Sequence, residues 1–295
     1  MHQSETLSGA WHEAERSVSA NQEQIDYWNG RAGQTWVEAQ DRLDAMLAPI
    51  SEALLQRAAV RTGERVVDIG CGCGDTSLAL ARSGAEVWGI DISEAMLTHA
   101  RTRALAMAET GNLAFSLIDA ATADFTPDHA LLFSRFGVMF FADPVSAFSN
   151  LRGALTADGR VCFVCWQAPR ENPWMAVAGR AVQPFLPDSA VTPDPRAPGP
   201  FAFADPGYVQ DILLAAGFSD IELEPFRTSL HVGDDLDDAI RFQSQVGPAA
   251  RVLSELEGPR REAAMQAVRE SLAAHVTSNG IDMAAACWMI MARRG

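Results

Sequence analysis

Basic residues are scarce in this chain of 295 residues. It carries 23 Lys plus Arg against 38 Asp plus Glu, which gives a formal net charge of −15 and a sequence pI of about 4.7. Nucleic-acid binding needs basic surface to neutralise phosphates, and anionic membrane surfaces attract basic clusters. The charge balance therefore argues against nucleic acid and against an anionic membrane surface as partners.

Long apolar runs are also lacking. The first residues, Met1-His2-Gln3-Ser4-Glu5, have neither the basic start nor the apolar run of a signal peptide. No stretch approaches the length of a membrane-spanning helix, and the longest late apolar run, residues 284–292, suits a strand. We therefore expect a cytoplasmic protein that does not insert into membranes.

Cysteines number only five, which fits a reducing cytoplasm. Cys162 and Cys165 have the C-x-x-C spacing of some metal and redox sites. They fall within a predicted strand, however, where an odd offset puts two side chains on opposite faces. We therefore expect ordinary buried cysteines and no metal site.

A hydrophobic content of 48% and the chain length predict one large domain with a smaller covering element. The most informative pattern begins at Val66, with an apolar strand, a turn containing Gly70, Gly72 and Gly74, and a helix starting near Thr76. The glycines allow a tight turn and close approach of a ligand. The free N–H groups of the helix would point at whatever occupies the turn.

This turn suits a cationic nucleoside better than a dinucleotide. A dinucleotide turn reads Gly-x-Gly-x-x-Gly, but Asp75 stands where the third glycine would fall. Asp68 also lies two residues before the first glycine. A carboxylate repels a pyrophosphate and attracts an ammonium or sulfonium group.

Two further predicted strands end in an acid. Asp91 follows the strand at 86–90, where a carboxylate can accept hydrogen bonds from two ribose hydroxyls. Asp119 follows the strand at 113–118, where it could accept from an adenine amino group. One acid at the end of each of three strands matches an adenosine bound across the C-terminal edge of a parallel sheet.

These residues resemble the class I S-adenosylmethionine-dependent methyltransferases, and among them the small-molecule group around the ubiquinone/menaquinone-biosynthesis methyltransferases. Residues 67–74 match the first motif of the family, residues 89–93 the second and Asp119-Ala120 the third, and the resemblance covers about residues 21–166. Cys73 departs from it, because Thr or Ser is commoner there. The resemblance implies an α/β fold with a doubly wound, seven-stranded, mostly parallel sheet and a late antiparallel hairpin. It implies methyl transfer from S-adenosylmethionine to a small organic acceptor, with S-adenosylhomocysteine as product.

The resemblance also implies which residues bind the cofactor. In related enzymes the segment before the sheet folds over the cofactor, and we expect Tyr27 or Trp36 to touch its methionine end; simple capping of the sheet edge is an equal alternative. The expected cofactor-binding residues in the sheet are Asp68, Gly70, Cys71, Gly72, Asp91, Ile92, Met96, Asp119 and Ala120.

Composition and spacing divide the chain into five segments. A flexible N-terminus (1–20) precedes a helical cover (21–62) and the cofactor-binding core (63–166). A proline-rich lid (167–204) surrounds one short helix near residues 174–185. The last part of the sheet (205–295) includes inserted helices at about 234–257 and 259–277.

In-line methyl transfer needs little charge stabilisation, so positioning can supply much of the rate. A general base is required only for a poorly acidic acceptor. The candidates are His231 after the sixth strand, His129 before the fourth and Glu171 in the lid. Arg135 at the end of the fourth strand could either bind an acidic substrate or pair with a structural acid.

Trp166, Arg170 and Trp174 follow the fifth strand and are expected walls of the acceptor pocket. Aromatic walls suit an apolar or aromatic acceptor and could attract the sulfonium through cation–π contact. Two alternatives stay open: a nicotinamide-dependent oxidoreductase and a non-catalytic S-adenosylmethionine-binding protein. The sequence names neither the acceptor nor the atom methylated, and a homodimer is possible.

Overall fold

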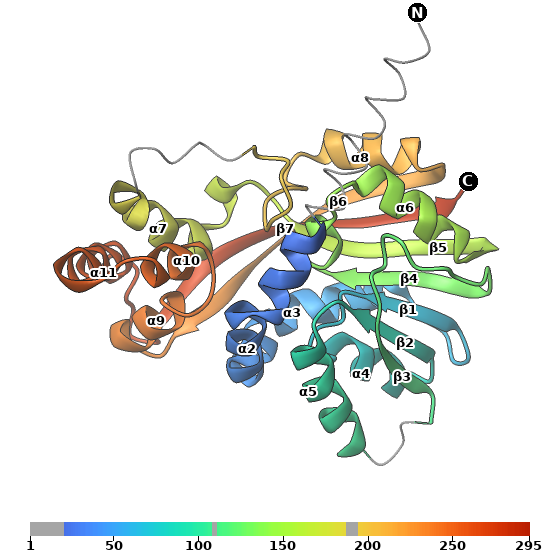
Figure 1. Ribbon diagram of the computed structural model, residues 1–295, viewed down its shortest axis with the longest axis horizontal. Helices are drawn as coiled ribbons and strands as arrows, with labels where there is room; N and C mark the ends of the chain where they lie inside the picture. The colour runs from blue at the N-terminus through green and yellow to red at the C-terminus, as the bar shows by residue number, and fades with distance from the viewer. Residues whose placement is uncertain (1–20, 108–110, 187–193) are drawn as a thin grey trace, which may run out of the picture.

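The computed structural model describes residues 21–107, 111–186 and 194–295. Within these ranges the strands form one seven-stranded sheet in the order β3-β2-β1-β4-β5-β7-β6 (Figure 1). Strands β1 to β5 pair in parallel, and β7 runs antiparallel between β5 and β6. This arrangement confirms the predicted doubly wound sheet with a late antiparallel hairpin. The strands are β1 (Arg65–Ile69), β2 (Glu86–Asp91), β3 (Leu113–Leu117), β4 (His129–Arg135), β5 (Leu155–Trp166), β6 (Phe218–Gly233) and β7 (Ile281–Arg294).

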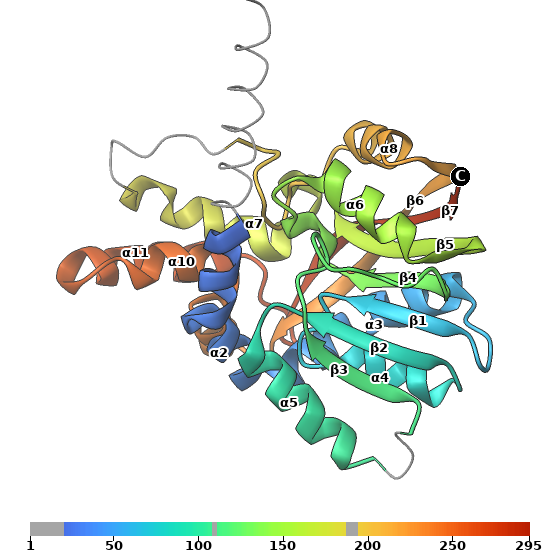
Figure 2. The same ribbon diagram turned by 45° about the vertical axis from the view of Figure 1, so that its right-hand side comes forward.

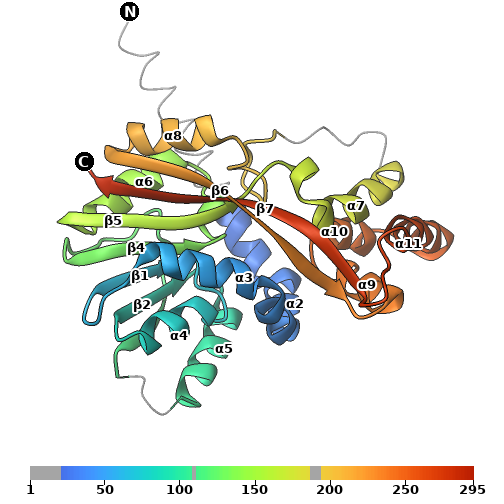
Figure 3. The same ribbon diagram turned by 180° about the vertical axis from the view of Figure 1, so that it is seen from behind.

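Helices cover both faces of the sheet, which explains why the central strands are apolar throughout. Helices α3 (Gln40–Ala58) and α4 (Asp75–Arg82) lie on one face, and α6 (Pro144–Gly153) and α8 (Pro206–Ala215) lie on the other (Figures 1 and 3). Helix α5 (Glu94–Leu105) packs against β2 and β3. Asp143-Pro144 and Asp205-Pro206 begin α6 and α8, and both aspartates cap their helices by accepting hydrogen bonds from backbone N–H groups.

The β6–β7 hairpin extends well past the rest of the sheet. Trp166, the last residue of β5, pairs with Cys287 of β7, which in turn pairs with Phe226 of β6. Strand β6 continues seven residues further, to Gly233. The sequence predicts this strand over residues 221–230, so the prediction misses its last three residues, 231–233.

Helices α7, α9, α10 and α11 lie around this overhang, and we call them the cap (Figures 1 and 2). Helix α7 contacts α10 and α11, while α9 contacts α11 and β6. The single helix predicted over 234–257 is wrong. Gly247 adopts a φ of 95° and Pro248 follows it, so the chain turns and starts a new helix. The cap helices are α7 (Pro173–Val182), α9 (Leu236–Gln243), α10 (Pro248–Ser254) and α11 (Gly258–Ala273).

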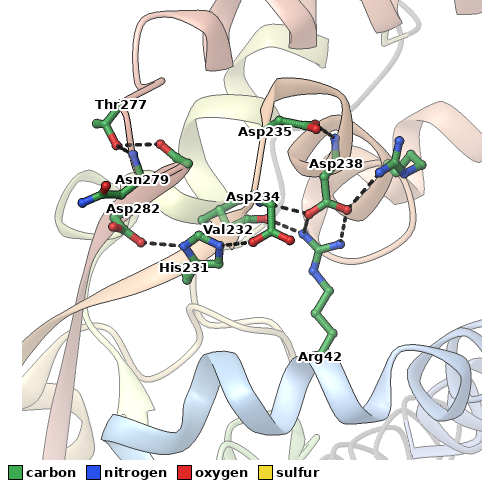
Figure 4. Close-up of polar contacts among 11 residues, drawn as sticks. Arg42, His231, Val232, Asp234, Asp235, Asp238, Thr277, Asn279 and Asp282 are labelled. Atoms are coloured by element: carbon green, nitrogen blue, oxygen red, sulfur yellow. Dashed lines mark hydrogen bonds and ion pairs between the residues drawn. The ribbon is translucent and has the colours of Figure 1, made fainter.

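The N-terminal cover consists of helical residues 21–29, α2 (Arg31–Glu38) and α3. Arg42 of α3 joins this cover to the cap. Its guanidinium donates to both carboxylate oxygens of Asp238, at 3.0 and 2.8 Å, and to the carbonyl of Val232 at 2.6 Å (Figure 4). It also lies 4.4 Å from the ring centroid of Phe242. The predictions for residues 1–20 and for part of the lid fall outside the described residues. Among the residues that the structure describes, no helix is long and apolar enough to cross a membrane.

Candidate active site

The turn after β1 brings backbone, not side chains, to the C-terminal edge of the sheet. Gly70, Gly72 and Gly74 have φ values of 65°, 55° and 82°, a region that side-chain-bearing residues rarely adopt. At Gly70 the space is closed as well, because an added Cβ would lie 2.8 Å from the Cα of Gly137. Two turns from neighbouring strands therefore touch here, the glycine turn after β1 and the turn after β4.

Asp68 is completely buried beneath the glycine turn. Its Oδ2 accepts hydrogen bonds from the hydroxyls of Thr76 at 2.8 Å and Ser77 at 2.6 Å. Its Oδ1 has no partner among the described residues. Burial raises the pKa of Asp68 to about 6, against the opposing effect of the two hydroxyls. A buried carboxylate oxygen without a donor is costly and would be stabilised by a cation.

Asp91 at the end of β2 is held in a fixed orientation. Its two oxygens accept backbone N–H bonds from Gly72 and Ser93, each at 2.8 Å. Burial raises the pKa of this carboxyl group. The carboxylate thus spans the glycine turn and the start of α5, and each oxygen keeps further capacity to accept a hydrogen bond.

Asp119, after β3, meets the N-terminal cover. Its Oδ1 accepts from the backbone N–H of Ala121 at 2.9 Å, and its Oδ2 accepts from the side-chain amide of Asn21. The cover is fastened nearby by Asn29, whose side chain donates to the carbonyl of Ile92 at 2.8 Å and accepts from the N–H of Glu94 at 3.1 Å. The segment before the sheet therefore folds over this edge.

The other sequence-predicted cofactor residues line the same edge. Cys71, Met96 and Ala120 are buried. The Met96 sulfur would lie 3.8 Å from a Cβ built at Gly72, so this side chain packs against the glycine turn. Ile92 contributes its carbonyl to the contact with the cover.

These residues fit S-adenosylmethionine. The unpaired Oδ1 of Asp68 suits an ammonium group, and the fixed carboxylate of Asp91 suits two adjacent hydroxyls. A diphosphate at the same turn would face Asp68 and Asp91 without a free cation to balance it, since the nearby Arg135 is paired with Asp75.

Aromatic side chains of the cover lie over the turn after β4. Trp28 packs edge-on against Trp36 and Phe140, with ring centroids 5.8 and 5.2 Å apart. Tyr27 is 47% exposed and touches the edge of Trp28. The sequence analysis names Tyr27 and Trp36 as cofactor contacts. In the structure Trp28 lies between them and contacts Tyr27, Trp36 and Phe140.

A second aromatic group stands at the ends of β4 and β5, and we call it the aromatic wall: Phe136, Trp166 and Trp174. Phe136 stacks on Trp166 at 4.0 Å between centroids and 9° between planes, and Trp166 lies 5.1 Å from Trp174. Phe136 has a φ of 65°, a strained value for a bulky residue and one that clusters at functional sites. Sequence reasoning predicted Trp166 and Trp174 as neighbours of the pocket and missed Phe136.

Of the two roles open for Arg135, the structure shows pairing with a structural acid. Its guanidinium donates to Asp75 and to the hydroxyl of Ser51, both at 2.7 Å, and its side chain is only 11% exposed. The guanidinium of Arg135 therefore joins α3 to the first residue of α4. The alternative role for Arg135, binding an acidic substrate in the catalytic site, does not fit this position.

His231 does not lie at this edge. It is five residues beyond Phe226 on β6, which along the strand is about 17 Å past the end of β5. Its neighbours Leu230 and Val232 are buried, so His231 points to the solvent face of the hairpin, where it contacts Asp282 and Asp234 (Figure 4). These two carboxylates raise the pKa of His231. The predicted base role does not fit this geometry.

The remaining candidates are also placed elsewhere. His129 is buried at the start of β4, the opposite end of the strand from the site. Glu171 pairs with Arg227 and Arg170. The side chain of Arg170 is 82% exposed, so the pocket-wall role predicted for it does not fit.

Comparisons with known proteins agree with this geometry. Residues 66–159 match a family described as a methyltransferase domain. Trans-aconitate 2-methyltransferase of Methylobacterium radiotolerans is 33% identical over 193 residues, which are 64% of this chain and 69% of that enzyme. Aklanonic acid methyltransferase DauC of a Streptomyces species is 34% identical over 130 residues, 42% of this chain and 58% of that enzyme. The solved YcgJ protein of Bacillus subtilis superposes with a TM-score of 0.55 at 18% identity, over 82% of this chain and 97% of that one.

The sheet order, glycine turn and strand-end acids define a Rossmann-like methyltransferase domain. The chain belongs to the S-adenosylmethionine-dependent methyltransferases, and it transfers a methyl group from that donor to a small organic acceptor. Neither a nicotinamide-dependent oxidoreductase nor a non-catalytic binding protein finds support among these relatives.

Proposed function

We propose that three strand-end acids hold the methyl donor. Asp68 would pair with its ammonium group, Asp91 would accept from both ribose hydroxyls, and Asp119 would accept from the adenine amino group. The orphan oxygen of Asp68 and the doubly anchored carboxylate of Asp91 support these roles. Cys71, Met96 and Ala120 would supply apolar contacts around them.

The acceptor would be a planar, largely apolar molecule bound against the aromatic wall. The wall adjoins the donor site, because Gly137 follows Phe136 and packs directly on Gly70. An acidic acceptor would need a free cation, but Arg135 is paired with Asp75. The trans-aconitate named in one relative is therefore not carried over to this chain.

Bound S-adenosylmethionine supplies an electrophilic methyl group on a sulfonium that leaves as a neutral thioether. The chain orients the acceptor and excludes water, and its buried aromatic rings provide both functions. Because His129, Glu171 and His231 lie elsewhere or are paired, we assign no general base. Positioning of the acceptor against the methyl group would then provide most of the rate acceleration.

The cellular setting follows from composition. With a net charge of −15 and five free, buried cysteines, we infer a cytoplasmic enzyme with no nucleic-acid partner. It would act as a monomer or homodimer, and sedimentation equilibrium distinguishes these states.

The fixed orientation of the Asp91 carboxylate is the main observation that supports the proposed methyl-donor site. Calorimetry with S-adenosylhomocysteine tests whether Asp91 belongs to this site. Asp91→Asn removes the charge and should raise the Kd at least tenfold, about the loss of a charge-assisted contact. Asp143→Asn is the matched control, because it removes one charge while asparagine still caps α6. Equal affinities of the two variants would remove Asp91 from the site.

A further inference from the structure

We propose that the indole N–H of Trp174 donates a hydrogen bond to an oxygen atom of the methyl acceptor. The acceptor would then be a planar conjugated molecule bearing a carbonyl or phenolic oxygen beside its ring. This inference rests on the proposed function and specifies the chemistry of the acceptor.

The indole N–H of Trp174 is buried and unpaired. The residue is 5% exposed, and its Nε1 has no hydrogen-bond partner among the described residues. Two other tryptophans show the ordinary situation: Trp88 donates to the hydroxyl of Ser116 at 2.9 Å, and Trp288 donates to the carbonyl of Ala204 at 3.0 Å. Nε1 is the one polar atom of a tryptophan side chain, so Trp174 is left with no polar contact through its side chain. Such a donor costs free energy until a partner arrives.

The backbone around Trp174 is rigid, so this orphan donor is held in place. Asn172, just before α7, donates to the carbonyls of Gln167 and Ala286, each at 3.0 Å, and accepts from the N–H of Ala286 at 2.9 Å. The carbonyl of Trp174 itself accepts from Gln243 of α9 at 2.6 Å. Three elements thus fix the start of α7.

The indole ring of Trp174 is connected to the methyl-transfer site through neighbouring side chains. Trp174 packs on Trp166, which stacks on Phe136, and the turn after Phe136 rests on the glycine turn. A series of aromatic contacts therefore links the glycine turn of the cofactor site to the ring that carries this N–H group. This arrangement favours a flat ring system with one oxygen at its edge and disfavours a polyanion.

A matched pair of small bicycles tests the inference on full-length protein saturated with S-adenosylhomocysteine. 1-Indanone and indane have nearly the same shape, but only 1-indanone carries a carbonyl oxygen. Binding is followed by ¹H–¹⁵N NMR titration. We expect wild-type protein to bind 1-indanone about tenfold more tightly than indane, the ratio that one buried hydrogen bond provides. The Trp174 indole N–H proton should shift downfield with 1-indanone, because a hydrogen bond deshields it, and indane should cause no such downfield shift.

Trp174→Phe keeps an aromatic ring but removes the N–H, and it should abolish the tenfold preference. Trp88→Phe, which removes an indole on the opposite part of the sheet, should retain it. A preference that survives in Trp174→Phe, or failure of both bicycles to bind, would overturn the inference while leaving the donor site intact. Should Trp174→Phe not fold, the indole resonance of the wild-type protein decides alone. Failure to bind S-adenosylhomocysteine would instead overturn the proposed function.

Discussion

Asp68→Asn should make the protein more stable and a poorer binder of its cofactor. The carboxyl group is completely buried, and burial raises its pKa from 3.8 to about 6. At neutral pH the folded state therefore holds a charge that the unfolded chain accommodates more easily. Asparagine has almost the same shape, and its carbonyl can still accept from Thr76 or Ser77.

The magnitude follows from this pKa. A rise from 3.8 to about 6 corresponds to about 3 kcal/mol at 1.36 kcal/mol per unit. One weakened hydrogen bond offsets about 1 kcal/mol of this, so the free energy of unfolding should increase by about 2 kcal/mol at pH 7.5. The wild-type penalty develops mainly between about pH 4 and about pH 6, because in that window the carboxyl group is ionised in the unfolded chain and still protonated in the folded protein. At pH 5 it falls to about 1.6 kcal/mol, and the difference between the two proteins should shrink to about 0.6 kcal/mol.

Urea denaturation at pH 7.5 and pH 5 measures the stability difference. Calorimetry with S-adenosylhomocysteine measures the second effect, a 10- to 100-fold loss of affinity when the ammonium loses its charged partner. Asp211→Asn on the exposed side of α8 should change neither quantity. A variant that is less stable at pH 7.5, or a stability difference that stays constant between the two pH values, would refute the reasoning.

Three more substitutions separate the site from its surroundings. Gly70→Ala should abolish binding of S-adenosylhomocysteine, because a Cβ at this position would lie 2.8 Å from the Cα of Gly137. Gly63 has a similar φ of 79° but open space around it, so Gly63→Ala should lower only the stability of the protein. Equal binding by the two variants, measured by calorimetry, would contradict this view of the turn. His231→Gln should leave that affinity unchanged. His231→Gln should lower the free energy of unfolding by less than about 0.5 kcal/mol. This loss should appear only at pH values below the raised pKa of His231, where the imidazole is charged and pairs with Asp282 and Asp234. Weaker cofactor binding in His231→Gln would return this residue to the active site.

The cofactor side of the site was largely readable from sequence, because it depends on local rules. A buried strand, a glycine turn and an acid at a strand end are contiguous patterns. Asp68, Asp91 and Asp119 therefore came out on one edge once the strands were ordered. The fold implied by the resemblance, a seven-stranded, mostly parallel sheet with a late antiparallel hairpin, is also correct.

The acceptor side was less readable, because it is built from long-range contacts. Arg135 has an acid partner 60 residues away in sequence, which no local pattern reveals. Phe136 matters through its positive φ and its stacking on Trp166, both set by neighbouring strands. His231 was misplaced because the β6 overhang was not predicted, and a strand that continues past its sheet carries its last residues away from the edge.

The contact between Asn21 and Asp119 has a consequence for turnover. In the proposed role of Asp119, the adenine amino group and the amide of Asn21 share one carboxylate, and Asn21 belongs to the helix formed by residues 21–29. Asn29 and the backbone of Trp28 latch that helix to the start of α5. Given that role, exchange of the cofactor would be coupled to movement of this helix.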